Sequence, residues 1–169
     1  MVKVGVCSDS HQKIQSLQKT VDFFKESGVS FIIHAGDICK KEGLDILKQS
    51  GLEYVVVYGN NDASLVQYHQ AYNLVKEPYY FLLQQTKIKL MHLPFYMTPD
   101  AQVVISGHTH KFHCEYVKNT LFLNPGEVCA REKPVSECAI LTIDEKVFDV
   151  DYFANYTLAK HFSFLREFE

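Results

Sequence analysis

The sequence predicts an α/β fold in which a parallel sheet in the first half of the chain is followed by antiparallel hairpins. Three short apolar runs in the first 60 residues each end in a polar cluster. The segment between the first two runs carries apolar side chains at helical spacing, as in a strand–helix–strand unit. After Pro78, apolar runs come in neighbouring pairs joined by short polar turns, which is typical of hairpins.

The three early runs are rich in Val and Ile and have the length of buried strands, at residues 2–7, 31–34 and 54–58. Residues 12–27 are predicted to form a helix, with an apolar face at Ile14, Leu17, Val21 and Phe24 and an expected stop at Gly28. Residues 43–49 and 63–74 are predicted to form two further helices. Ligands of such sheets collect at the carboxyl ends of the strands.

In the second half, we expect strand pairs at residues 79–83 with 88–92, 112–117 with 121–123, and 139–143 with 147–153. A separate strand is expected at residues 102–106. The tail, residues 155–169, places Leu158, Phe162 and Leu165 at helical spacing, which predicts a short amphipathic helix.

Length, charge and cysteine content limit the classes of protein to which this chain can belong. A chain of 169 residues with a formal charge of −3 fits one domain, residues 1–169. No long run of one charge sign supports a nucleic-acid partner, and no segment has the length of a signal peptide core or membrane span, so we expect a cytoplasmic protein. Five widely spaced cysteines without a CxxC pair predict reduced thiols.

Polar side chains that can bind metals follow five of the predicted strands. They are Asp9 and His11, Asp37, Asn60, His92, and His108 and His110. Carboxylate, imidazole and amide donors suit a divalent ion of intermediate hardness. Taken singly, each Asp or Asn could be a helix cap or turn former and each His a surface residue. Together they are too many for one tetrahedral ion, and the number indicates a pair of ions.

The order of these motifs resembles the signature of the calcineurin-like metallophosphoesterases, with the small bacterial and archaeal phosphodiesterase subfamily as the best match. The matching elements are Asp9-x-His11, Gly36-Asp37, Gly59-Asn60-x-Asp62, His92, Gly107-His108-x-His110 and Asn124-Pro125-Gly126. The resemblance covers residues 9–126.

The resemblance implies a four-layer α/β/β/α sandwich of two mixed sheets flanked by helices. It also implies that Asp9, His11 and His110 hold one metal ion, that Asn60, His92 and His108 hold the other, and that Asp37 bridges them. Mn²⁺ is the first expectation, with Fe, Zn, Ni, Co and Mg as alternatives. The implied reaction is direct attack of a metal-bridging hydroxide on a small organic phosphoester, with a phosphodiester favoured over a monoester.

Several positions depart from the family pattern. Asp37, Asn61 and Asp62 occupy the catalytic positions, but relatives carry His or Cys where this chain has Asn61, and a neutral amide cannot protonate a leaving group. His92 lacks the usual His-Gly-His context, and only residues 94–101 stand where relatives insert a helix. Phe95, Tyr96 and Met97 could form an apolar lip beside the site, or a loop that fills its own gap.

Two other interpretations stay open. The retromer scaffold subunit resembles this fold, so partner binding is the alternative to catalysis. Arg131 follows the Asn-Pro-Gly element, where the subfamily often has an arginine, but it can equally be a solvated loop residue. His34, His69, His113 and His161 match no motif and are interpreted as structural or solvated. The tail can dock on its own sheet or support a homodimer.

Overall fold

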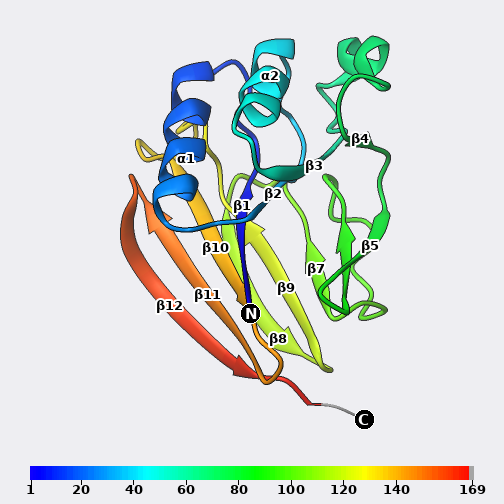
Figure 1. Cartoon of the computed structure of the whole chain (residues 1–169), viewed down its shortest axis with the longest axis vertical. Coiled ribbons are helices and arrows are strands. Elements are labelled where there is room, and N and C mark those ends of the chain that lie inside the picture. The colour runs from blue at the N-terminus through cyan, green and yellow to red at the C-terminus, as the bar shows by residue number, and fades with distance from the viewer. Residues whose placement is uncertain (168–169) are drawn as a thin grey trace.

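A computed structural model describes residues 1–167 of the chain and contains two mixed β-sheets with flanking helices (Figure 1). The elements in chain order are β1 (Val2–Cys7), α1 (Ile14–Glu26), β2 (Phe31–His34), α2 (Lys41–Gln49), β3 (Glu53–Val57), a 3₁₀ helix η1 (Ala63–Tyr68), β4 (Leu74–Val75), β5 (Tyr79–Leu83), β6 (Thr86–Leu90), β7 (Val103–Ile105), β8 (Phe112–Val117), β9 (Thr120–Pro125), β10 (Glu137–Ile143), β11 (Val147–Ala154) and β12 (Thr157–Leu165). The predicted α/β fold is confirmed.

The first sheet has seven strands in the order β12-β11-β10-β1-β2-β3-β4, and the second has five in the order β5-β6-β7-β9-β8. Strands β1 to β4 are parallel, while β10 to β12 add an antiparallel meander beside β1. In the second sheet, β6, β7 and β9 are parallel, and β5 and β8 pair antiparallel with their neighbours. The predicted parallel first half and later hairpins are therefore both present.

Two apolar layers hold the fold together. The first lies between the sheets and includes Val4, Ile33, Leu90, Ile105 and Leu123. The second lies between the seven-stranded sheet and helices α1 and α2, which cover its outer face (Figure 1). The outer face of the five-stranded sheet carries a smaller apolar cluster beneath the loop of residues 91–102. This loop contains residues 94–101, the short segment that stands where relatives insert a helix, and it forms no helix.

Phe24 anchors α1 to the sheet. Its side chain is fully buried, and a Cβ atom placed on Gly5 of β1 would lie 2.5 Å from its ring, so the ring packs directly on the strand backbone. We expect Phe24→Ala to lower the free energy of unfolding by about 3 to 5 kcal/mol, because truncating a buried aromatic leaves a cavity. Urea unfolding measures this. Phe95→Ala, at a side chain that is 74% exposed, should change it by no more than about 0.5 kcal/mol.

The helix predicted for residues 63–74 is shorter than expected and is not an α-helix. The segment forms the 3₁₀ helix η1, then turns, and ends in β4, which pairs with β3. Only Leu65 is buried within η1, so the segment lacks the apolar stripe that stabilises a longer helix.

The helix predicted for the tail is wrong. Residues 157–165 form β12, which pairs along its length with β11. Phe162 and Phe164 lie on one face of the strand, where their rings pack against Phe112 and Tyr116 of the other sheet. In this strand every second side chain, Phe162 and Phe164, faces inward, and this strand pattern prevails over the helical spacing of Leu158, Phe162 and Leu165. The tail joins its own sheet as a strand, and of the three apolar residues named for it Phe162 packs inward whereas Leu158 and Leu165 are exposed. Residues 168–169 lie outside the described part of the chain.

No helix within residues 1–167 is long and apolar enough to cross a membrane.

Candidate metal centre

The strand ends that carry the predicted ligands meet on one side of the molecule. The ligands follow β1, β2, β3, β6 and β7, as expected from the sequence pattern. Five of the seven have positive φ angles, namely Asp9, His11, Asp37, His108 and His110. This conformation strains the backbone of non-glycine residues, and residues strained in this way cluster at active sites and ligand-binding sites.

Glycines allow the ligand loops to approach one another closely. A Cβ atom on Gly59 would lie 2.2 Å from the Asp37 carboxylate, and one on Gly107 would lie 2.2 Å from Ser8 Oγ. Both positions therefore require the absence of a side chain. This gives the Gly36-Asp37, Gly59-Asn60 and Gly107-His108 motifs a steric explanation.

Asp9, His11 and His110 form one group of donors. His110 Nε2 lies 3.3 Å from Asp9 Oδ1 and 3.4 Å from His11 Nε2. Asp9 Oδ2 accepts hydrogen bonds from Ser8 Oγ and from the backbone N–H of His108. Asp9 Oδ1 is buried and has no hydrogen-bond partner among the described residues. Burial raises the pKa of Asp9 and lowers that of His11.

Asn60, His92 and His108 form a second group. Asn60 Oδ1 lies 2.9 Å from His92 Nε2 and 3.2 Å from His108 Nδ1. Asn60 and His108 are exposed, whereas His92 is fully buried. Glu77 accepts hydrogen bonds from the backbone N–H groups of His92 and Leu93, which holds the start of the short loop in place. This group therefore faces solvent on one side.

Asp37 lies between the two groups. Its Oδ2 is 3.4 Å from His92 Nε2 and 3.7 Å from His11 Nε2. Asn61 donates to both oxygens, through its backbone N–H and through Nδ2. Burial favours a higher pKa for Asp37, but hydrogen bonds from His92 and Asn61 outweigh it and hold the pKa well below its usual range. The carboxylate is therefore ionised.

The ring nitrogens indicate that a cation belongs here. His92 Nδ1 donates to the carbonyl of Ala35, so Nε2 faces Asn60 Oδ1 and Asp37 Oδ2, either as an N–H donor in the protonated ring or, once that proton is lost, as a lone pair that a metal ion can accept. Likewise His110 Nδ1 faces Glu127, and its Nε2 faces Asp9 Oδ1. A positive charge, carried by a proton or by a metal ion, is therefore needed between these facing atoms. Donors that share one ion with bonds of about 2.1 Å lie about 3.0 to 3.4 Å apart, close to the separations here, so the residues fit divalent metal.

Asp62 supports the site from behind. Its carboxylate is buried and accepts hydrogen bonds from the backbone N–H groups of Asp37, Cys39 and Gly59 at 2.7 to 2.8 Å. These bonds join the loop after β2 to the loop after β3. Asp62 therefore positions Asp37 and Asn60 relative to each other.

Glu127 contacts the predicted ligand His110 but was not among the residues predicted from the sequence. Its side chain is fully buried, one carboxylate oxygen accepts from His110 Nδ1, and the other accepts from the backbone N–H groups of Glu132 and Lys133. Burial favours a higher pKa for Glu127, but the His110 and backbone hydrogen bonds outweigh it and lower the pKa. An acid inside the apolar stretch of residues 120–130 was the available signal.

The remaining histidines and the cysteines lie outside the ligand groups proposed from the sequence. His34 is buried beneath the site, contacts Ser10 Oγ, and has a pKa lowered to about 3 by burial, so it is neutral. All five cysteines are free, as predicted. Cys39 and Cys129 lie beside His11 and His110, and burial raises the pKa of each thiol to about 12, which keeps them protonated.

A polar cavity of about 750 Å³ opens above this centre. Its lining includes His11, Asn61, Lys13 and Arg131. Lys13 and Arg131 are both exposed and carry positive charge at this cavity. Phe95, Tyr96 and Met97, the predicted apolar lip, are 74%, 47% and 37% exposed. Arg131 lines the polar cavity together with His11 and Asn61.

The sequence model of the calcineurin-like phosphoesterase superfamily domain matches residues 2–146. A phosphodiesterase of Methanocaldococcus jannaschii is 24% identical over 161 residues, which cover 87% of this chain and 96% of the relative.

Solved structures share the fold, and an archaeal phosphodiesterase and a Vps29 protein are two of them. An archaeal phosphodiesterase superposes with a TM-score of 0.80 at 23% identity, covering 90% of this chain and 99% of its own. Wild-type Vps29 of Entamoeba histolytica, crystallised with zinc, superposes with a TM-score of 0.67 at 21% identity, covering 97% of this chain and 99% of its own.

Proposed function

The chain belongs to the calcineurin-like phosphoesterase superfamily, and we propose that it is a two-metal hydrolase of small organic phosphodiesters, with residues 1–169 as one metallophosphoesterase domain. The observation that carries this proposal is the convergence of imidazole nitrogens on carboxylate and amide oxygens at the strand ends. In particular, Asp9 Oδ1 is buried and has no hydrogen-bond partner within residues 1–167, and it faces His110 Nε2 at 3.3 Å. A metal ion would satisfy both atoms.

In this proposal, Asp9, His11 and His110 hold one ion, Asn60, His92 and His108 hold the other, and Asp37 is shared. Paired divalent ions acidify water and stabilise both the attacking and the leaving oxygens of an in-line displacement. Asp37 stays ionised through its hydrogen bonds from Asn61, so it supplies negative charge to the pair. Asp62 holds the loops that carry Asp37 and Asn60. Lys13 and Arg131, at the edge of the polar cavity, attract the phosphate.

The experiment that tests the proposal is metal analysis of the purified protein, followed by assays with phosphomonoesters, phosphodiesters and cyclic nucleotides in the presence of Mn²⁺. We expect close to two divalent ions per chain and faster turnover of diesters than of monoesters. Protein that binds no divalent ion and hydrolyses no ester would overturn the proposal.

Asn61 should make the enzyme selective for good leaving groups. Its amide donates to Asp37 and cannot give up a proton, whereas a general acid contributes about 10² to 10⁴ in rate. We expect p-nitrophenyl diesters to be hydrolysed much faster than alkyl diesters. Asn61→His should raise kcat for alkyl diesters by about a hundredfold and change the aryl rate far less.

Asn119→His, in the β8–β9 turn, is the matched control for the added imidazole and should leave both rates unchanged. Equal rates on both ester classes in the unmodified protein, or an alkyl rate that falls steeply on the acid side of its pH profile, would show that another residue donates the proton.

A partner-binding scaffold is the alternative function. Bound metal is compatible with both functions, so turnover is the measurement that separates them. His108→Ala removes an exposed donor without touching the buried core, and an enzyme should then lose hydrolysis while keeping its fold. A scaffold would show no hydrolysis before or after this change.

A further inference from the structure

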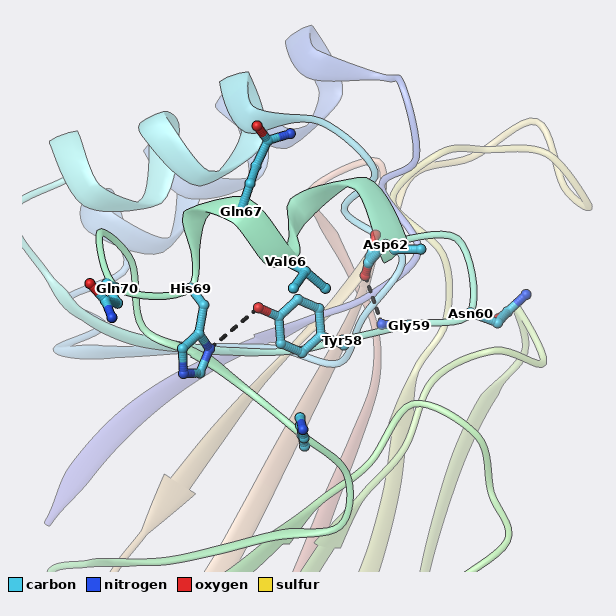
Figure 2. Close-up of a pocket in the computed structure, with 10 residues that line it drawn as sticks. Tyr58, Gly59, Asn60, Asp62, Val66, Gln67, His69 and Gln70 are labelled. Carbon is cyan, nitrogen blue, oxygen red and sulfur yellow. Dashed lines mark hydrogen bonds between the residues drawn. The ribbon is translucent and has the colours of Figure 1, made fainter.

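A second cavity, of about 640 Å³, begins at Asn60 and extends away from the polar cavity. The loop of residues 59–62 separates the two, since Asn60 and Asp62 line this cavity and Asn61 lines the other. Figure 2 shows Asn60 at one end of the second cavity and His69 and Gln70 at the opposite end. The cavity therefore leads outward from the proposed position of one metal ion.

Aromatic and aliphatic side chains form the wall of this cavity. The rings of Tyr58 and His69 are nearly parallel, with an interplanar angle of 19° and centroids 6.4 Å apart, and Tyr58 Oη lies 3.4 Å from His69 Nδ1. Val66 of η1 lies beside the Tyr58 ring (Figure 2). These contacts hold the Tyr58 ring in one orientation next to an aliphatic group.

Val66 is 61% exposed although it belongs to the lining of a concave surface. A single exposed aliphatic residue on a flat surface needs no explanation. Here the exposed methyl groups stand beside an oriented aromatic ring and a proposed metal ligand, which is the usual composition of a small-molecule pocket. The apolar surface is therefore placed where a substrate group can cover it.

Polar groups border the apolar wall. Gln70 contributes an amide that can donate and accept hydrogen bonds, and Lys76 contributes a cation. The Lys76 ammonium forms no ion pair within the described part of the chain, residues 1–167. An apolar surface with a few polar groups at its edge suits a flat ring that carries heteroatoms.

We propose that this cavity is a binding subsite for a planar aromatic ring on one ester arm of the substrate. The inference rests on the proposed function, because the metal centre would hold the phosphate to which the arm is attached. Each cavity then binds a different part of the substrate. The polar cavity with Lys13 and Arg131 receives the anionic side, and the cavity of Tyr58 and Val66 receives the ring. Aryl groups and nucleobases share the chemistry that this surface recognises.

The test uses non-hydrolysable probes, so binding is measured apart from turnover. Phenylphosphonate, thymidine 5′-phosphonate and methylphosphonate are titrated into protein loaded with diamagnetic Zn²⁺, and the methyl resonances of Val66 are followed by NMR. We expect the two ring-bearing probes to shift these resonances and to bind about tenfold more tightly than methylphosphonate. Equal affinities, or Val66 resonances that do not move, would overturn the subsite.

Variants locate the effect. Val66→Arg should abolish the advantage of the ring-bearing probes, whereas Leu82→Arg, at a 71% exposed apolar residue on β5, should preserve it. Tighter binding of the thymidine probe than of phenylphosphonate would identify a nucleoside arm, and the reverse order would identify a simple aryl arm.

The two proposals fail separately. Ring-dependent binding without hydrolysis of p-nitrophenyl diesters would remove the proposed function and retain the subsite. Hydrolysis with ring-independent binding would remove the subsite and retain the proposed function.

Discussion

Asp37→Ala is expected to lower kcat/KM for a p-nitrophenyl diester by at least about a thousandfold. The Asp37 carboxylate lies 3.4 Å from His92 and 3.7 Å from His11, so it is placed between the two groups of donors. Loss of a shared metal ligand removes several kcal/mol of charge stabilisation in the transition state, and each 1.4 kcal/mol is about tenfold in rate. Metal analysis of the same variant should find fewer than two ions per chain.

Asp22→Ala is the control, since Asp22 is an exposed acid on α1 whose carboxylate accepts a hydrogen bond from Gln18 of the same helix. This variant should retain full activity and metal content. A thousandfold loss in both variants would indicate a general effect of charge. Undiminished turnover in Asp37→Ala would remove Asp37 from the centre.

The position of the candidate centre could be predicted because it depends on a regular feature of the fold. Parallel strands place their carboxyl ends at a common edge, so polar residues after successive apolar runs must lie close together. Asp9, Asp37 and Asn60 follow β1, β2 and β3 in this way. His92 and His108 also follow apolar runs, but their strands belong to the other sheet, and only the family pattern predicted that they lie beside Asp37 and Asn60, because the packing of two sheets is not visible in strand periodicity.

The tail could not be predicted from its own spacing. Leu158, Phe162 and Leu165 suit one face of a helix, but Phe162 and Phe164 suit one face of a strand equally well. The pairing with β11 and the aromatic contacts across the sheets decide between these alternatives, and both depend on residues distant in sequence. Local patterns predicted the type of element correctly where either the helical or the strand period dominated. They failed in the tail, where both periods were present.

Glu127 could not be recognised for a related reason. A buried acid is unusual, but its role depends on His110, which the topology brings beside it from 17 residues earlier in the chain. A carboxylate that accepts from one ring nitrogen of a metal-binding histidine fixes the tautomer and leaves the other nitrogen free to bind. Glu127 is therefore expected to position His110 for the ion that we propose it shares with Asp9 and His11.

Glu127→Gln should weaken divalent-metal binding by about 10- to 100-fold with little change in shape. The remaining amide oxygen can still accept from the backbone N–H groups of Glu132 and Lys133, so the amide nitrogen would face His110 Nδ1. Two donors then oppose each other, and His110 relieves the conflict by moving its proton to Nε2, the atom that must bind metal. Chelator competition measures the affinity.

Glu132→Gln is the matched control, because Glu132 is exposed and close to Glu127 in sequence, and it should bind metal like the unmodified protein. Urea unfolding of the metal-free proteins separates positioning from stability, since a purely structural role for Glu127 would lower stability and leave the affinity of the folded protein unchanged. Because saturating metal compensates for weakened affinity, kcat of Glu127→Gln should recover partly as the metal concentration rises. An affinity equal to that of the unmodified protein would show that His110 reaches its metal-binding tautomer without this carboxylate.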